Sequence, residues 1–477
     1  DYNIDIQKRN VNYRHYRMIF TAGGNQDEFT FNSAIVNGDI YAWGNNDDEI
    51  LGFNDNTSFP AGTNVHRPSQ ISTLDDIVQV SVGGYGHTMF LHRNGKVSSV
   101  GKGDNGRLGH GNTDDLKIPT EITEYNTGSS FKGVISICCG YNHTVALHDN
   151  GNISTWGRGD YGYLGLGNTS DADKPTKIST FENGSSFPGE SSIVQINTWG
   201  HHTLALHDDG TVSSWGYDNS KGSLGHTNTN IATQKPKKIS GLSDVIYVGT
   251  GYFTSYAIHK DGTVSSWGLN TDGQLGLGDN TDRSTPTKIS NLSNVKQIVG
   301  GDYFTVAVLN DGSIRTCGHN NVGQLGRGAA EAYNSTNTFV NTSPVQNDVV
   351  QAVCGWKHTL LLHTNGEVSS FGSNSDGQLA LPNNSSGGYQ RSVTKINTQN
   401  GAQMNLTGVN LVAAGGVTSF ALKSSSTRAY SLQGLPIQTD YNILTPSEPI
   451  GASKKGFSIS AWIKTDDVSI SWQPICE

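Results

Sequence analysis

The stretch "GLNTDGQLGLGDNTDRSTPTKIS", residues 268–290, is one copy of a phrase that the chain repeats. Related phrases begin at Gly101 ("GKGDNGRLGHGNTDDLKIPTEIT") and at Gly157 ("GRGDYGYLGLGNTSDADKPTKIS"). Self-similarity at a fixed spacing is typical of repeat proteins, in which each copy is one structural unit that packs against its neighbours. The first prediction is therefore a repeat architecture.

Several positions recur in register along the chain. A Leu follows each marker glycine at a nearly constant offset, and the next residue is Gly in every repeat except the last, which has Ala380. Most repeats also carry an upstream glycine and a proline. The marker glycine that ends each "SWG"-like phrase is found at Gly44, Gly101, Gly157, Gly216, Gly268, Gly318 and Gly372. A period of roughly 50 residues with strand-like content indicates a solenoid or a propeller.

Alternating apolar and polar residues predict short strands within each repeat. "HTVALHDNGNISTWG", residues 143–157, contains two strand-like runs around an Asn-Gly pair, which is typical of a two-residue hairpin turn. The proline suits the start of an outer strand, where a missing N–H costs no ladder hydrogen bond. Four short strands per repeat give a propeller blade, and we expect the Trp of each "SWG" phrase to pack between blades.

"VSSWGLNTDGQLGLGDNTDRSTPTKI", followed by "VGGDYFTVAV", resembles the repeat of the regulator of chromosome condensation family. The resemblance covers residues 39–422 and implies a seven-bladed β-propeller. Three copies depart from the pattern, because Val100, Cys317 and Phe371 replace the Trp.

Ring closure leaves two counts open. Ala413–Leu422 is expected to pair beside Asp39–Trp43, so that either Ser33–Val36 or Ser419–Leu422 lies outside the ring, or an eighth blade exists. We favour seven blades, because Tyr430–Leu432 fits the first strand of a different domain.

That second domain is predicted from "FSISAWIK" and "WQPI", which resemble the opening of a laminin-G/concanavalin-like jelly roll. The expected fold class is all-β: a seven-bladed β-propeller plus the N-terminal part of a β-jelly-roll sandwich. Residues 1–38 would form an N-terminal segment that partly closes the ring, 423–429 a linker, and 430–477 an incomplete jelly roll. We therefore expect the whole protein to be longer.

Composition argues against several classes of function. The net charge is −9 with no basic run, which disfavours nucleic-acid binding. No apolar run approaches the roughly 18 residues that span a bilayer, so membrane insertion is not expected. Five cysteines without a CxxC motif do not make a disulfide framework.

No catalytic, cofactor-binding or metal-binding residues are predicted, so we expect a protein that is not an enzyme. Nine of the fifteen histidines fall into two repeat slots, which favours hydrogen-bonded structural roles over metal ligation. The "RGD" at Arg158–Asp160 occupies a polar turn that every repeat has, so integrin binding is not expected from it.

One set of residues resembles a recognition surface. Large aromatic residues flank the upstream glycine of the repeats, where loops between blade strands would gather them around one mouth of the ring. They are Tyr85, Tyr141, Trp199, Tyr252, Tyr303 and Trp356. We expect the polar Leu-Gly loops on the opposite face. Packing against the neighbouring blade would account for the same residues.

These observations predict a non-catalytic binding or structural protein, an extracellular or virion-surface adhesin or fibre component within a possible larger assembly. Its partner would be a protein or glycan on a host or assembly surface, and no cofactor is expected. The alternative is a cytoplasmic guanine-nucleotide exchange factor for a small GTPase, the founding activity that the propeller resemblance implies. That activity depends on a β-wedge insertion, for which the repeat spacing leaves little room. A weaker option is a module attached to a glycosidase.

Overall fold

The computed structural model describes most of the repeat array and four residues before it. The described residues are 2–3, 19–20, 38–47, 49–53, 62–189, 192–227, 232–329, 334–381, 388–396 and 406–424. Among them, no helix has the length and apolar content needed to cross a bilayer. The jelly roll predicted over 430–477 lies outside the described residues.

Two compact units are distinguished by their internal contacts. One comprises Asn37–Ser425, and the other combines Asp1–Val36 with Ser426–Glu477. In the second unit, β1 (Tyr2–Asn3) and β2 (Ile19–Phe20) pair antiparallel.

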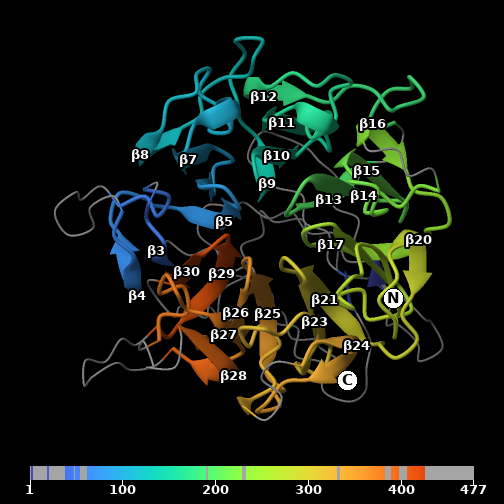
Figure 1. Cartoon of the computed structure of the whole chain (residues 1–477). Helices are drawn as coiled ribbons and strands as arrows, with labels where there is room; N and C mark the ends of the chain where they lie inside the picture. The colour runs from blue at the N-terminus through green and yellow to red at the C-terminus, as the bar shows by residue number, and fades with distance from the viewer. Residues whose placement is uncertain are drawn as a thin grey trace, which may run out of the picture. The chain divides into compact units, whose positions relative to one another are not determined.

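The larger unit consists of seven four-stranded antiparallel sheets arranged around a central axis (Figure 1). In one sheet, β17 (Val245–Thr250) is innermost, followed outward by β18 (Thr254–His259), β19 (Val264–Gly268) and β20 (Arg283–Lys288). Innermost strands of neighbouring sheets contact each other around the ring. The predicted all-β, seven-bladed propeller is confirmed.

Five further blades have the same strand order from the inside outward. Three of these blades precede β17, and the first consists of β5 (Ile77–Gly83), β6 (His87–His92), β7 (Val97–Gly101) and β8 (Leu116–Glu121). The second consists of β9 (Val134–Cys139), β10 (His143–His148), β11 (Ile153–Gly157) and β12 (Ala172–Lys177). The third consists of β13 (Ile193–Thr198), β14 (His202–His207), β15 (Val212–Tyr217) and β16 (Ala232–Lys238). The two that follow β20 are β21 (Val295–Gly300), β22 (Phe304–Leu309), β23 (Ile314–Gly318) and β24 (Thr336–Asn341); and β25 (Val349–Cys354), β26 (His358–His363), β27 (Val368–Ser373) and β28 (Tyr389–Lys395). Two 3-10 helices, η1 (Asp104–Gly106) and η2 (Asp160–Gly162), lie between third and fourth strands.

The seventh blade closes the ring with strands from both ends of the array. Its order is β29 (Val409–Gly415), β30 (Thr418–Ser424), β3 (Gly38–Gly44) and β4 (Val65–Ile71). The β3–β30 ladder runs from the pair Gly38↔Ser424 to the pair Gly44↔Thr418. The predicted pairing is confirmed, and Ser419–Leu422 lies inside the ring. Ser33–Val36 is outside the described residues.

The Asp-Gly hairpins form, but not as the predicted two-residue turns. The Gly262 N–H donates to the carbonyl of His259 at 2.8 Å, and the His259 N–H donates to the carbonyl of Thr263 at 2.8 Å. Only the glycine of the pair has a positive φ, +77°. A β-turn that ends in a glycine bulge therefore replaces the two-residue turn, which would need positive φ at both positions.

Tryptophans of the "SWG" phrases lie between blades, as predicted. Trp267 is fully buried, and its Nε1–H donates to the carbonyl of Ser223 in the preceding blade at 2.9 Å. A Cβ on Gly225 would lie 2.9 Å from the same Nε1 atom, so the Leu-Gly turn must contain glycine to pack there. Where Cys317 replaces the Trp, Phe339 of β24 packs against the corresponding glycine and fills the volume.

Candidate functional site

The structure brings the six predicted aromatic residues together at one mouth of the ring. We call Tyr85, Tyr141, Trp199, Tyr252, Tyr303 and Trp356 the aromatic cluster. Each follows an innermost strand, in the loop that leads to the second strand of its blade. The Tyr141 ring lies 4.7 Å from that of Tyr85, 5.3 Å from Trp199 and 5.5 Å from Tyr252, centroid to centroid.

Tyr141 is the centre of the aromatic cluster and is only 4% exposed. Its phenol donates a hydrogen bond to Oδ1 of Asp302 at 2.7 Å, from a blade that is not its neighbour. Burial, followed by the negative charge of Asp302, raises the pKa of Tyr141. Burial also raises the pKa of Asp302 to about 6, although the Tyr141 hydrogen bond and Lys357 oppose that shift. The hydrogen bond therefore joins a neutral phenol to a poorly solvated carboxyl group.

The remaining cluster members differ in exposure. Tyr85 is 45% exposed, whereas Trp199, Tyr252, Tyr303 and Trp356 are half-buried. The Trp199 indole donates to the carbonyl of Cys354 at 3.1 Å, a contact between non-adjacent blades. Packing thus accounts for Tyr141, while parts of the other rings remain accessible at the mouth.

Sequence reasoning missed two members of this site. His201 and Asp302 occupy the slot directly after the upstream glycine, where four other blades have Tyr or Trp and the ring-closing blade has Val417. The His201 ring lies 4.8 Å from that of Tyr141 and 5.6 Å from that of Tyr252. The repeat slot itself was the available signal, because any side chain placed there reaches the mouth.

The prediction that the Leu-Gly loops lie on the opposite face is wrong. The Arg107 guanidinium, next to the Leu-Gly pair of its loop, donates to the carbonyl of Tyr85 at 2.7 Å. The Lys102 N–H donates to the carbonyl of Gly86 at 2.7 Å. In a four-stranded antiparallel sheet the first and third connections leave from the same end, so both sets of loops share one face.

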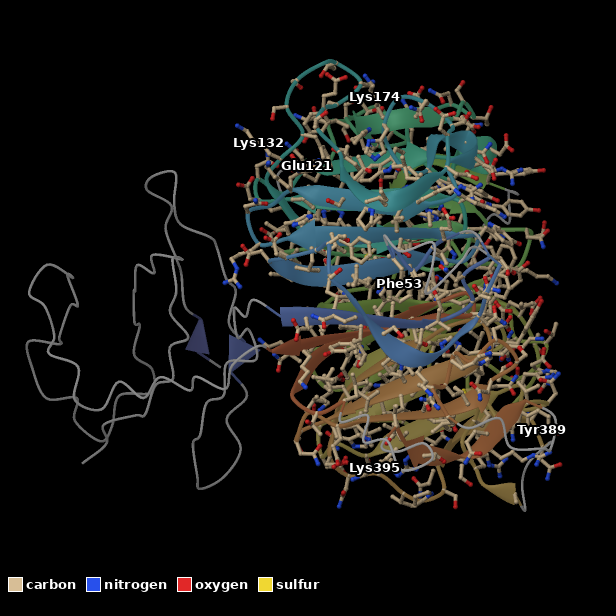
Figure 2. The ribbon with its side chains drawn as sticks, turned by 90° about the vertical axis from the view of Figure 1, so that its left-hand side faces the viewer. Phe53, Glu121, Lys132, Lys174, Tyr389 and Lys395 are labelled. Atoms are coloured by element: carbon tan, nitrogen blue, oxygen red, sulfur yellow. The ribbon has the colours of Figure 1, made fainter. Side chains whose placement is uncertain are left out.

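Figure 2 shows the two ends of the blades. Tyr389, which begins β28, lies toward the end that carries the Leu-Gly loops, and Lys132 lies at the other end, where the chain enters β9. The aromatic cluster and the polar loops around it therefore form a single composite face.

A shallow depression of about 650 Å³ adjoins Tyr85 on this face. Its lining includes Lys102, Arg107 and Arg158. The Arg158 guanidinium binds the Asp160 carboxylate at 2.8 Å. The "RGD" motif is thus closed on itself by an ion pair.

The first histidine slot joins neighbouring blades. The four residues, which we call the histidine belt, are fully buried: His87, His143, His202 and His358. The Ser255 hydroxyl donates to the carbonyl of Ser223 at 2.8 Å, so Nε2 of His202, 2.7 Å from the same oxygen, must be its donor. Equivalent contacts join Nε2 of His87 to Thr144 and that of His358 to Ser419.

The second histidine slot acts within a blade. Nε2 of His148 lies 2.9 Å from the Ser154 hydroxyl, and His92, His207, His259 and His363 make the same contact six residues along. Within the described part of the chain, no group of three or more His, Cys, Asp or Glu side chains is placed to hold a metal ion. Burial raises the pKa of the thiols of Cys139 and Cys354 to about 12, so these cysteines are not activated nucleophiles.

Known proteins share both the sequence pattern and the fold. The ultraviolet-B receptor UVR8 of Arabidopsis thaliana is 31% identical over 356 residues, which are 73% of this chain and 76% of that receptor. The E3 ubiquitin-protein ligase HERC2 of Homo sapiens is 36% identical over 207 residues, which are 43% of this chain but only 4% of the ligase.

Solved structures agree on the architecture. Prp20p from Saccharomyces cerevisiae superposes with a TM-score of 0.70 at 22% identity, over 84% of this chain and 96% of that one. Human WBSCR16 superposes with a TM-score of 0.67 at 21% identity, over 82% of this chain and 100% of that one. The model of the RCC1-like domain matches residues 39–421, and the chain therefore belongs to the RCC1-like domain family.

Proposed function

We propose that the propeller is a non-catalytic binding module and that its partner docks on the face that carries the aromatic cluster. The observation that supports this is the gathering of six large aromatic side chains, most of them partly accessible, at the mouth of a rigid ring. Tyr and Trp anchor interfaces well because they bury a large area and lose little side-chain entropy on docking.

The absence of catalysis is part of the proposal. The belt histidines are committed to hydrogen bonds between blades, and the second set to bonds within hairpins. The buried cysteines are held as thiols by their raised pKa. These histidines and cysteines, which belong to the residue types most often used as bases and nucleophiles, are thus assigned structural roles in the proposal.

A protein partner is favoured over a glycan. The solved structure of Prp20p is described together with its binding to Gsp1p and histones, so a propeller of this fold can present a protein-binding surface. The depression beside Tyr85 supplies charged groups next to the aromatic rings, a mixture typical of protein interfaces.

The test uses a photo-crosslinking residue placed at Tyr85 in the full chain, with Val345 as the control site. Val345 is 62% exposed and follows β24, at the other end of its blade. The crosslinked partner is identified and purified, and its Kd is measured for a Tyr85→Ala/Trp356→Ala double variant. We expect affinity to fall by about 100-fold or more, as for two interface anchors. Unchanged affinity, or crosslinks from Val345 alone, would place the site elsewhere.

Guanine-nucleotide exchange is the second candidate, and it rests on family membership alone. A nucleotide-release assay with a Ran-type GTPase would separate the two. Stimulated release that survives the double substitution at Tyr85 and Trp356 would favour exchange at another surface. The placement of the protein outside the cell or on a virion depends on residues 430–477 and stays a prediction.

A further inference from the structure

Among the described residues, Asp302 is the one whose carboxylate forms a hydrogen bond with the aromatic cluster. Its Oδ1 atom accepts the Tyr141 phenol at 2.7 Å. No described donor contacts Oδ2, and no described cation lies within ion-pair distance of the carboxylate. Lys357 influences Asp302 through its charge, but its side chain is exposed and forms neither a hydrogen bond nor an ion pair with the carboxylate. The site therefore holds negative charge without a paired cation.

One aromatic ring contacts this carboxylate, and further rings lie next to that ring. Tyr141 touches it directly, and the Tyr252 ring lies 5.5 Å from that of Tyr141 and 5.6 Å from that of Tyr303. The Trp356 ring lies 6.4 Å from that of Tyr141. Burial is the main cause that raises the pKa of Tyr252 and Tyr303, and the charge of Asp302 adds to the shift of both phenols. Ring faces attract cations through their quadrupole, and a carboxylate beside them adds a full negative charge.

We infer that this mouth receives a single cationic side chain from the partner protein, with Asp302 as its counter-ion and the half-buried rings as its walls. An arginine fits best. Its planar guanidinium stacks on aromatic rings, pairs with a carboxylate, and is less strongly hydrated than an ammonium group. The inference deepens the proposed function by naming the chemistry of the docked group.

The charges around the aromatic cluster are arranged to direct such a side chain. The depression beside Tyr85 is lined by Lys102, Arg107 and Arg158, and also by Asp104. The charges of Arg107 and Arg158 are paired with the carboxylates of Asp104 and Asp160. Asp302 has no paired cation among the described residues, so a partner cation is attracted to Asp302 rather than to the depression, which helps to orient the partner.

The probe is N-acetyl-L-arginine amide, with the neutral isostere N-acetyl-L-citrulline amide as its control. Saturation-transfer NMR on the full chain measures both. We expect saturable binding of the arginine probe only, weakened about 10-fold or more by Asp302→Asn, since a buried charge-assisted pair is lost. Asp114→Asn removes an exposed carboxylate of a Leu-Gly loop on the same face and should leave binding unchanged. Equal binding of the two probes, or no effect of Asp302→Asn, would overturn the inference.

This experiment separates the inference from the proposed function. The arginine probe needs no partner, so it reports on the site even if the natural partner docks elsewhere. Once a partner is identified, its affinity should fall in both Tyr85→Ala and Asp302→Asn. A loss in Tyr85→Ala with none in Asp302→Asn would leave the binding face in place and refute the cation site. Unfolding temperatures of each variant show that the fold is intact.

Discussion

Tyr141 and His143 are two residues apart, yet they belong to regions that are built differently. His143 is part of the histidine belt, and its Nε2 atom lies 3.4 Å from the hydroxyl of Thr203 in the next blade. Tyr141 reaches across the ring to Asp302, 161 residues away. The belt is made of repeated contacts between neighbouring blades, whereas the side-chain hydrogen bonds of the aromatic cluster, from Tyr141 and Trp199, join blades that are not adjacent.

The difference shows how one repeat serves two purposes. Belt contacts join residues 53 to 61 positions apart, about one repeat, so each can form wherever two blades pack. Cluster contacts such as Trp199 with Cys354 form only when the ring is closed. The belt therefore stabilises the packing of neighbouring blades, whereas the residues of the aromatic cluster can differ from blade to blade.

Acidification should disrupt the histidine belt, and of the changes predicted here it should have the largest effect on the free energy of unfolding. Burial lowers the pKa of His143, His202 and His358 to about 3, while an unfolded histidine titrates near 6.5. Between these pH values the histidines are protonated in the unfolded chain but not in the folded chain. The free energy of unfolding should therefore fall as the pH drops from about 6.5 toward 3. Urea unfolding at a series of pH values measures this slope.

A single substitution tests whether the belt histidines cause this change of unfolding free energy with pH. His202→Gln removes one titrating belt residue and should make the loss of stability with acid less steep. His66→Gln, at an exposed position of β4, should leave the slope unchanged. A slope that is identical in all three proteins would show that the belt does not control acid stability.

Trp267→Ala should cost about 3–5 kcal/mol of unfolding free energy, because it leaves a large cavity between two blades. Trp267 and Ser255 both donate to the carbonyl of Ser223, so the substitution also removes part of the contact that His202 completes. Chemical denaturation measures the change. Tyr161→Ala, at a 45% exposed position, is the control and should be close to neutral. Parental stability in Trp267→Ala would contradict the packing between blades.

Tyr141→Phe tests the aromatic cluster and should have the smallest effect on stability, about 1 kcal/mol, the net worth of one hydrogen bond. Its clearer consequence is on Asp302, whose pKa should rise above about 6 because the phenol that favours the charged form is lost. Carboxyl NMR titration measures that pKa. Tyr303→Phe is the matched control, and an unchanged Asp302 pKa in Tyr141→Phe would show that the hydrogen bond is not formed.

Much of the fold was predictable because its cause is local and repeated. Strands, blade count and the tryptophans between blades follow from a pattern that recurs in register. The hairpin at Gly262 and the face of the Leu-Gly loops were predicted wrongly. The first depends on a backbone choice between two turns that the same Asp-Gly pair permits. The second depends on the order of the strands in each sheet, because the first and third connections of a four-stranded antiparallel sheet leave from the same end.

The sequence by itself determined the repeat, and with it which slots are buried and which reach the mouth of the ring. It also placed Tyr85, Tyr141, Tyr252 and Trp356 in equivalent slots. Only the tertiary structure decided that Tyr141 would be buried at the centre and bound to Asp302, while Tyr85 stays exposed. Equivalent slots become unequal when side chains from seven blades converge on one axis, because the space there is shared and no single repeat contains the information about its neighbours.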